Sequence, residues 1–173
     1  MDRRACVLLL GLLACPRGAR ARPAPELDAP WSAEVSVGYG AAIGGGAGAL
    51  AVRPSPLVLT LGGAAAIRAE PAVAAHGALV LETLDRGAVG AMAGVRLPRL
   101  AGGLRLGVDA IAMMAPYTLV GLALRAGRCV ALSPGMRMCP EVGLTSFVEG
   151  SDLAPGQVSS QLLLLVGVEL DAR

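Results

Sequence analysis

The sequence predicts an all-β fold, an antiparallel up-and-down meander closed into a barrel of 8–10 strands. Apolar and polar residues alternate with period two over most of the chain after residue 30, which places them on opposite faces of strands. Gly, Pro and Asp residues separate the alternating stretches at short intervals, and no convincing helical period follows the N-terminal region. An open meander of this length would expose two sheet edges, so closure into a barrel is expected.

Composition describes an apolar protein with no nucleic-acid signature. The 173 residues suffice for one domain with its own core. Hydrophobic residues make up 54% and charged residues 16%, and the mean hydropathy is +0.63. Part of this bias is of the kind that GC-rich coding produces, because Lys and Asn are absent, so periodicity carries more weight than composition. A net charge of +2 without a basic cluster, together with 2% aromatic residues, gives no case for nucleic acid as a partner.

The N-terminus predicts export. Two arginines at positions 3 and 4 precede an apolar run over residues 5–14, which is too short to span a bilayer but suits a secretory signal. Cleavage after Ala21 would make residues 1–21 a signal peptide. Alternatively, residues 12–15 resemble a lipobox, which would leave an acylated Cys15 and a lipid-anchored periplasmic protein. Residues 22–30 contain three prolines and are expected to form a linker before the barrel domain, residues 31–173.

Alternation defines the strands in order. The residues from Trp31 to Tyr39 alternate between apolar and small or polar side chains, and a glycine-dense turn follows. Prolines, glycines and a central Asp85 separate the later stretches. The expected strands are residues 31–39, 49–53, 57–68, 75–82, 89–97, 104–112, 118–125, 128–133, 136–149 and 158–171. Ten strands are favoured, counting the short stretches 49–53 and 128–133, and eight remain open if either of these is a loop.

Residues 128–149 predict a hairpin with a turn at residues 133–135. This register sets Cys129 opposite Cys139 and Leu132 opposite Met136. One face is then polar, with residues Ala131, Arg137, Glu141, Gly143, Thr145 and Glu149. Directly opposed cysteines can form a disulfide, and an even cysteine pair in an exported chain favours one over two free thiols.

The polar faces carry single charges of mixed sign among Gly, Ala, Ser and Thr. This is too little charge for a typical soluble exterior and is the pattern of an internal ion-pair network. The predicted luminal network consists of Glu34, Arg68, His76, Glu82, Arg96, Arg105, Asp109, Arg125, Glu141 and Glu169. The apolar faces would then contact lipid, and the strands are near the length that a tilted membrane strand requires.

Two features keep a soluble barrel open as an alternative. Aromatic girdles are typical of membrane barrels, but only Trp31, Tyr39, Tyr117 and Phe147 are available, and the chain does not end in an aromatic residue. In a soluble periplasmic barrel the apolar face would line the interior and bind a small apolar ligand. That lining would comprise Leu59, Leu79, Leu106, Leu122 and Leu164. Helical membrane spans over residues 35–52 and 110–124 are the third architecture, disfavoured by their glycine clusters and Pro116.

The signal sequence, the meander of strands about ten residues long and the amphipathic last strand together resemble a small bacterial outer-membrane β-barrel protein. The resemblance covers residues 31–171 as a pattern and matches no motif residue by residue. It implies an outer-membrane location, lipid as a partner and a non-enzymatic structural or surface-interaction role in the envelope. It implies no functional residue and names no protein partner.

Catalysis and cofactor binding are discounted. His76 is the only histidine, and a membrane-embedded lipid-modifying enzyme using it would need an orienting carboxylate. Glu82 is too far along the same strand, so Glu34, Asp109 or Glu141 would have to serve. A hydrogen-bonded luminal histidine is the simpler interpretation. The glycines of residues 38–46 open no helix for a phosphate, and the two cysteines lack further zinc ligands. No cofactor or metal is therefore predicted.

Overall fold

The computed structural model describes residues 31–46, 49–68, 73–84, 87–100 and 104–172. The predicted signal peptide and linker, residues 1–30, lie outside this part. Ten strands are present in it: β1 (Trp31–Gly46), β2 (Ala49–Pro54), β3 (Leu57–Arg68), β4 (Val73–Thr83), β5 (Ala88–Leu100), β6 (Leu104–Ala115), β7 (Leu119–Arg128), β8 (Val130–Ser133), β9 (Met136–Gly150) and β10 (Val158–Ala172). The described residues contain no helix that is long and apolar enough to cross a membrane.

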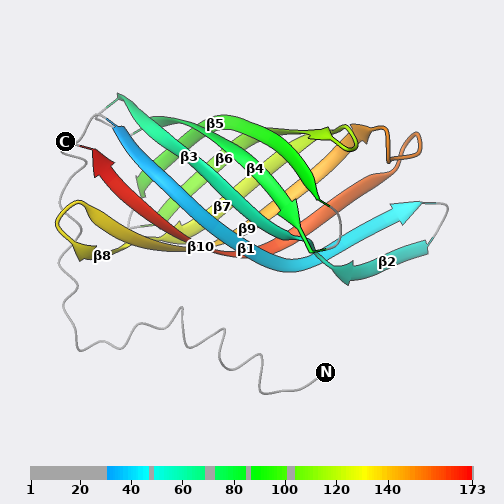
Figure 1. Cartoon of the computed structure of the whole chain (residues 1–173), viewed down its shortest axis with the longest axis horizontal. Helices are drawn as coiled ribbons and strands as arrows, with labels where there is room; N and C mark the ends of the chain where they lie inside the picture. Colours follow the sequence, from blue (N-terminus) through cyan, green and yellow to red (C-terminus); the bar gives the residue numbers. More distant parts are fainter. Residues whose placement is uncertain (1–30, 47–48, 69–72, 85–86, 101–103, 173) are drawn as a thin grey trace, which may run out of the picture.

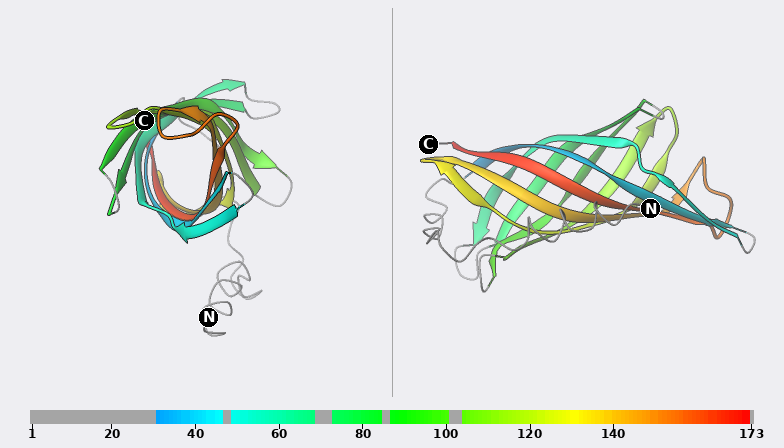
Figure 2. Two further views of the ribbon diagram at one scale, coloured as in Figure 1. Left: turned by 90° about the vertical axis from the view of Figure 1, so that its right-hand side faces the viewer. Right: turned by 90° about the horizontal axis from the view of Figure 1, so that it is seen from below.

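Eight strands close the barrel, in the order β1-β3-β4-β5-β6-β7-β9-β10, and β10 pairs with β1 to complete the ring (Figures 1 and 2). All pairings are antiparallel. The predicted all-β meander is confirmed. The number of barrel strands is the lower end of the predicted range, because β2 and β8 each pair with only one neighbour.

The two short strands are continuations of barrel strands. Opposite β1, the partner changes from β3 at Val58 to β2 at Pro54. Opposite β9, it changes from β7 at Gly127 to β8 at Val130. β2 and β3 are therefore parts of one long interrupted strand, and so are β7 and β8. The hairpin that each long strand forms with its partner extends beyond the barrel wall. The extensions lie at opposite ends (Figure 1). We call the end where β1 begins and β10 ends the terminal end, and the other the loop end.

The turn of the disulfide hairpin is shorter than predicted. β8 ends at Ser133 and β9 begins at Met136, so the loop has two residues, Pro134 and Gly135. Gly135 has a φ of 81°, the left-handed conformation that the third residue of a type II turn needs and that glycine adopts without strain. Met136 pairs with Ser133 across an irregularity, whereas the sequence predicted Leu132 as its partner.

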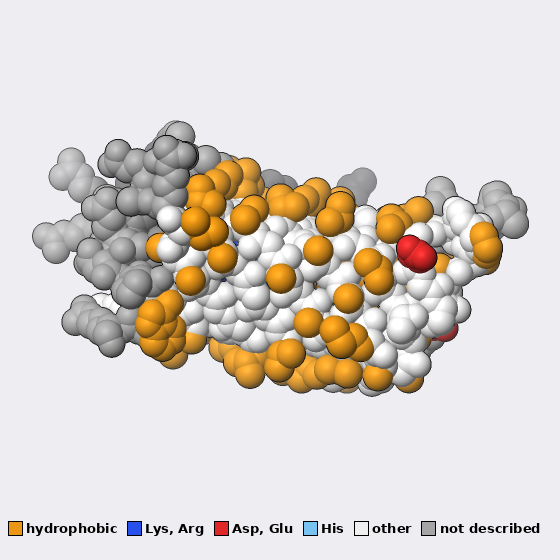
Figure 3. All heavy atoms as spheres, turned by 90° about the horizontal axis from the view of Figure 1, so that it is seen from above, with side chains coloured by type: hydrophobic (Ala, Val, Ile, Leu, Met, Phe, Trp, Pro, Cys, Tyr) orange, Lys and Arg blue, Asp and Glu red, His pale blue; other side chains and the backbone are white. Residues whose placement is uncertain are grey.

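Apolar side chains face outward along the strands. Outward-facing residues of β1 include Val35 and Val37, and those of β7 include Leu122 and Leu124 (Figure 3). Charged residues that are exposed, among those whose side chains are described, are Arg53, Arg128, Glu149 and Asp152. They lie at strand ends, in the β2 extension or in a loop. The barrel wall between these positions therefore shows no described charge to its surroundings.

The outward orientation of the apolar faces contradicts the alternative prediction of a soluble barrel with an apolar, ligand-binding interior. The leucines that would have lined its interior face outward: Leu79 is 57% and Leu122 58% exposed, and Leu59 and Leu164 are exposed as well. Leu106, on the same face, is only partly buried. The physical reason is that eight strands enclose a narrow lumen, and the alternate residues, which carry the charges, occupy it.

Candidate functional site in the barrel lumen

Two layers of side chains fill the lumen. The half nearer the terminal end holds charged residues from β1, β4, β5, β6, β7, β9 and β10. The half nearer the loop end holds an apolar cluster of buried residues: Val58, Val80, Ala88, Met92, Ile111, Met113, Leu119, Phe147, Leu163 and Leu165. An apolar cluster across a narrow barrel excludes water, so the charged layer is separated from the loop end.

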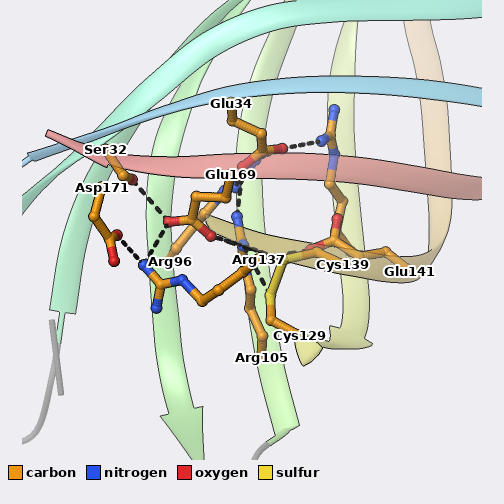
Figure 4. Close-up of a disulfide and its surroundings, with 11 residues drawn as sticks. Ser32, Glu34, Arg96, Arg105, Cys129, Arg137, Cys139, Glu141, Glu169 and Asp171 are labelled. Carbon is orange, nitrogen blue, oxygen red and sulfur yellow. Dashed lines mark hydrogen bonds and ion pairs between the residues drawn. A yellow bond between two sulfur atoms is a disulfide. The ribbon is translucent and has the colours of Figure 1, made fainter. Parts of the chain in front are cut away.

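Arg105 on β6 is the centre of the charged layer. Its Nη2 lies 2.6 Å from Glu34 Oε2 on β1, its Nε 3.3 Å from Glu141 Oε1 on β9, and its Nη1 2.7 Å from Glu169 Oε2 on β10 (Figure 4). A planar guanidinium with five donors can serve three carboxylates at once. Arg105 therefore connects β6 across the lumen to β1, β9 and β10, none of which is its neighbour in the sheet.

A second arginine completes the coordination of Glu34. Arg96 Nη1 on β5 contacts Glu34 Oε2, and Arg96 Nη2 donates to Oε1 at 3.2 Å. Beside these arginines, a Cβ at Gly107 would lie 3.5 Å from Arg96 Cγ and 3.8 Å from Arg125 Cβ, which is ordinary van der Waals contact. A larger side chain there would displace one of the arginines.

The charged layer continues to the terminal end through Arg137. Its Nη2 lies 3.5 Å from Glu169 Oε1 and also contacts Asp171. Ser32 donates from Oγ to the same Glu169 oxygen at 2.7 Å. The carboxylate of Glu169 is thereby shared between Arg105, Arg137 and Ser32.

Glu169 therefore links the centre of the charged layer to the mouth of the barrel at its terminal end.

His76 on β4 is hydrogen-bonded through both ring nitrogens. Its Nδ1 lies 2.7 Å from Asp109 Oδ1, and its Nε2 lies 2.8 Å from Arg96 Nη2. Arg96 can only donate, so Nε2 accepts and the proton is assigned to Nδ1, which donates to Asp109. His76 is 5% exposed. Neither ring nitrogen is left to accept a proton from a substrate, so this geometry gives no support to a lipid-modifying enzyme.

The disulfide joins Cys129, between β7 and β8, to Cys139 on β9. It lies on the luminal side of the hairpin, where Arg105 Nη1 is 3.4 Å from one sulfur and 3.5 Å from the other (Figure 4). Both cysteines also belong to a cluster with Glu169 that has metal-ligating spacing among the described residues. Because the two sulfurs are bonded to each other, they are not thiolate ligands, and the cluster offers a metal only one carboxylate.

Glu82 on β4 lies apart from the charged layer, among residues of the apolar cluster in the half of the lumen nearer the loop end. Its Oε2 accepts a hydrogen bond from Tyr117 Oη at 2.7 Å, and its Oε1 accepts one from Gln161 Nε2 at 3.0 Å. The carboxylate is buried, with 4% exposed. These contacts place a hydrogen-bonded carboxyl group directly below the loop-end mouth.

Comparison with solved structures finds similar chains. Neisserial surface protein A (NspA) is similar with a TM-score of 0.52 and 10% identity, over 83% of this chain and 97% of that chain. Ail, the attachment invasion locus protein of Yersinia pestis, has a TM-score of 0.48 and 13% identity, over 82% of this chain and 99% of that chain. The fold resembles that of small outer-membrane β-barrel proteins. No protein-family model and no curated protein matches the chain.

The structure places nine of the ten residues of the predicted luminal network in the barrel interior: Glu34, His76, Glu82, Arg96, Arg105, Asp109, Arg125, Glu141 and Glu169. The side chain of Arg68, the tenth, lies outside the described part. Eight of the nine belong to the charged layer, and Glu82 does not. Cys129 and Cys139 form the predicted pair.

Residues that the predicted network left out are Arg137, Asp171 and Gln161. All three share the period-two parity of the luminal residues on β9 and β10, and parity had already placed Arg137 on the polar face of the hairpin, so the signal was present although the network omitted them. Glu149 is the opposite case, because parity predicted it on the polar inner face and the structure exposes it. A register shift at Val120 and Gly121 leaves Val148 without a partner on β7. This bulge reverses the parity beyond Val148.

Proposed function

We propose that the protein is a non-enzymatic outer-membrane β-barrel protein with a structural or surface-interaction role in the bacterial envelope. The observation that carries the proposal is the inverted polarity of the barrel. Charged side chains fill the lumen, whereas the described strand faces outside it are apolar. In water this arrangement would expose a large apolar surface and bury charges at a cost, and in a bilayer it is the favourable one.

The height of the apolar wall supports a membrane location. On β1 the outward-facing residues from Trp31 to Ile43 are all apolar. Twelve residue steps of about 3.3 Å give a strand length of about 40 Å. At a tilt of about 45° this corresponds to a height of about 28 Å, close to the apolar band of about 25 Å in outer-membrane barrels.

Fractionation of the full chain, expressed in a Gram-negative host, tests the location. We expect the processed protein in the outer-membrane fraction, resistant to a urea or carbonate wash and extracted only by detergent. Unheated samples should migrate faster on a gel than boiled ones, because the folded barrel survives the detergent. A processed protein that is freely soluble in the periplasm would contradict the proposal.

The filled lumen supports a role that involves no ion conduction. Eight strands enclose an interior just wide enough for side chains, and here the apolar cluster adds a dry layer across it. We expect planar bilayers with the refolded protein to show no steps in conductance above those of a protein-free bilayer. Regular, voltage-independent steps would show an open pore and contradict this part of the proposal.

A further inference from the structure

A small cavity opens at the loop-end mouth of the barrel. Its volume is about 80 Å³. Five strands and three loops line it, with the residues Arg53, Pro56, Glu82, Tyr117, Leu119, Phe147, Asp152, Leu153, Ser159 and Gln161. The loop between β9 and β10 contributes Asp152 and Leu153, and it lies at this mouth in Figure 2 (left).

The floor and the rim of the cavity differ in chemistry. At the floor, buried Phe147 and Leu119 belong to the apolar cluster, and the Glu82 carboxylate lies beside them. At the rim, Arg53 and Asp152 are exposed. A concave site with an apolar base and a few convergent polar groups is the usual form of a small-molecule site.

Glu82 has acceptor capacity left after its two hydrogen bonds. Each carboxylate oxygen has two lone-pair sites, and each accepts one bond, from Tyr117 or from Gln161. Gln161 uses its amide nitrogen as the donor, so its carbonyl oxygen is a further acceptor. A group that enters the cavity must therefore donate, and a cationic donor satisfies a buried carboxylate best.

A metal ion fits this cavity less well than an organic cation. The described residues bring no group of three His, Cys, Asp or Glu ligand atoms together here, and the cation Arg53 lines the same cavity. The size is also limiting. A cavity of about 150 Å³ holds benzene, so this one accommodates about three to four non-hydrogen atoms, and the rest of a ligand must extend to the rim.

We propose that this cavity binds the ammonioethyl end of a zwitterionic ligand, with the ammonium group at Glu82 and the anionic group at Arg53. O-Phosphoethanolamine has this chemistry, either free or as the headgroup of a phospholipid. The site goes beyond the envelope role proposed above and does not depend on it, because it requires only the closed barrel. Tyr117 adds an aromatic ring next to the ammonium position.

The test is an NMR titration of the full chain, purified in an uncharged maltoside detergent, with O-phosphoethanolamine as the probe. Saturable shifts are expected at the loop end. Ethanolamine, which lacks the anion, and ethyl phosphate, which lacks the ammonium group, should each bind at least about tenfold more weakly. Phosphocholine should do the same, because its quaternary nitrogen has no N–H to donate.

Variants locate the binding. Glu82→Gln keeps the size of the side chain and removes its charge, and it should weaken binding of the probe about tenfold or more. Arg53→Gln should do the same from the rim. The matched control is Glu149→Gln, an exposed carboxylate near the same end but outside the cavity lining, which should leave affinity unchanged.

Two outcomes overturn the proposal. One is the absence of saturable binding up to tens of millimolar probe, and the other is equal affinity of the Glu149→Gln and Arg53→Gln variants. If the Glu82→Gln variant shows no heat-modifiable band on a gel, it does not fold. The affinity of the Arg53→Gln variant and the comparison of probes then still test the proposal. Titration in nanodiscs with and without phosphatidylethanolamine separates the sources, because a lipid headgroup in the cavity would compete with the free probe and raise its apparent Kd.

Discussion

Replacement of Arg105 by Met tests whether the charged layer holds the barrel together. The substitution keeps an unbranched side chain but removes a guanidinium that contacts Glu34, Glu141 and Glu169. In the variant, Arg96 still forms an ion pair with Glu34, and Arg137 still forms one with Glu169. The ion pair that the structure shows for Glu141 is lost altogether, and its carboxylate stays in the lumen.

The expected loss of stability follows from this remaining charge. Removing one partner of a buried ion pair costs about 3–5 kcal/mol, because the other is left uncompensated. We therefore expect Arg105→Met to lower the free energy of unfolding by at least about 3 kcal/mol. Adding Glu141→Gln removes the uncompensated charge, so the double variant should recover about 1–3 kcal/mol of that loss.

Urea unfolding in lipid vesicles, followed by fluorescence, measures the effect. Trp31 is the only tryptophan, and it lies on the outer face at the terminal end, so in the proposed membrane orientation unfolding transfers it from lipid to water. Arg128→Met is the control, because Arg128 is exposed at the end of β7 and its loss should cost less than about 0.5 kcal/mol. A stability for Arg105→Met within about 0.5 kcal/mol of this control would refute the reasoning.

Three further predictions concern the hairpin, the outer face and the lumen. Replacing both Cys129 and Cys139 by Ser should cost about 2–3 kcal/mol, the entropy of a loop whose ends are 10 residues apart, and thiol alkylation of the wild type should require prior reduction. Leu124→Arg, on the wall of β7, should cost about 2–4 kcal/mol in vesicles, whereas Leu132→Arg on the β8 extension should cost much less; equal costs would argue against lipid contact. Gly107→Ala should be tolerated and Gly107→Leu should cost about 1–3 kcal/mol by overpacking the lumen, which the same unfolding assay measures.

The sequence could predict which face each residue occupies, because side-chain direction in a strand depends only on parity. Arg105 and Asp109 on β6 illustrate this, since both were expected on the polar face and both are buried. Parity fails where a bulge inserts a residue. Glu149 was expected on the inner face by parity, but the bulge at Val148 turns it outward. No residue type around Val148 predicts a bulge there.

The partners of each charge could not be predicted. Arg105 and Glu34 are 71 residues apart, and their contact depends on the stagger of the strands around the closed ring, which alternation does not specify. The same holds for the short strands. Their sequences show that they are strands, but only the pairing shows that β2 continues β3 and that β8 continues β7.

The two faces of the barrel contribute differently to this stagger. The outer face is almost uniformly apolar, so a strand that slips by two residues would still present Leu, Val or Ala outward, and the outer face gives little information about register. The lumen does distinguish the registers. A slip of β6 by two residues would carry Arg105 about 7 Å along the strand and away from its three carboxylates. Buried ion pairs are seldom a net source of stability, so we infer that the charged layer is kept because it selects one register, while the apolar cluster beside it excludes water.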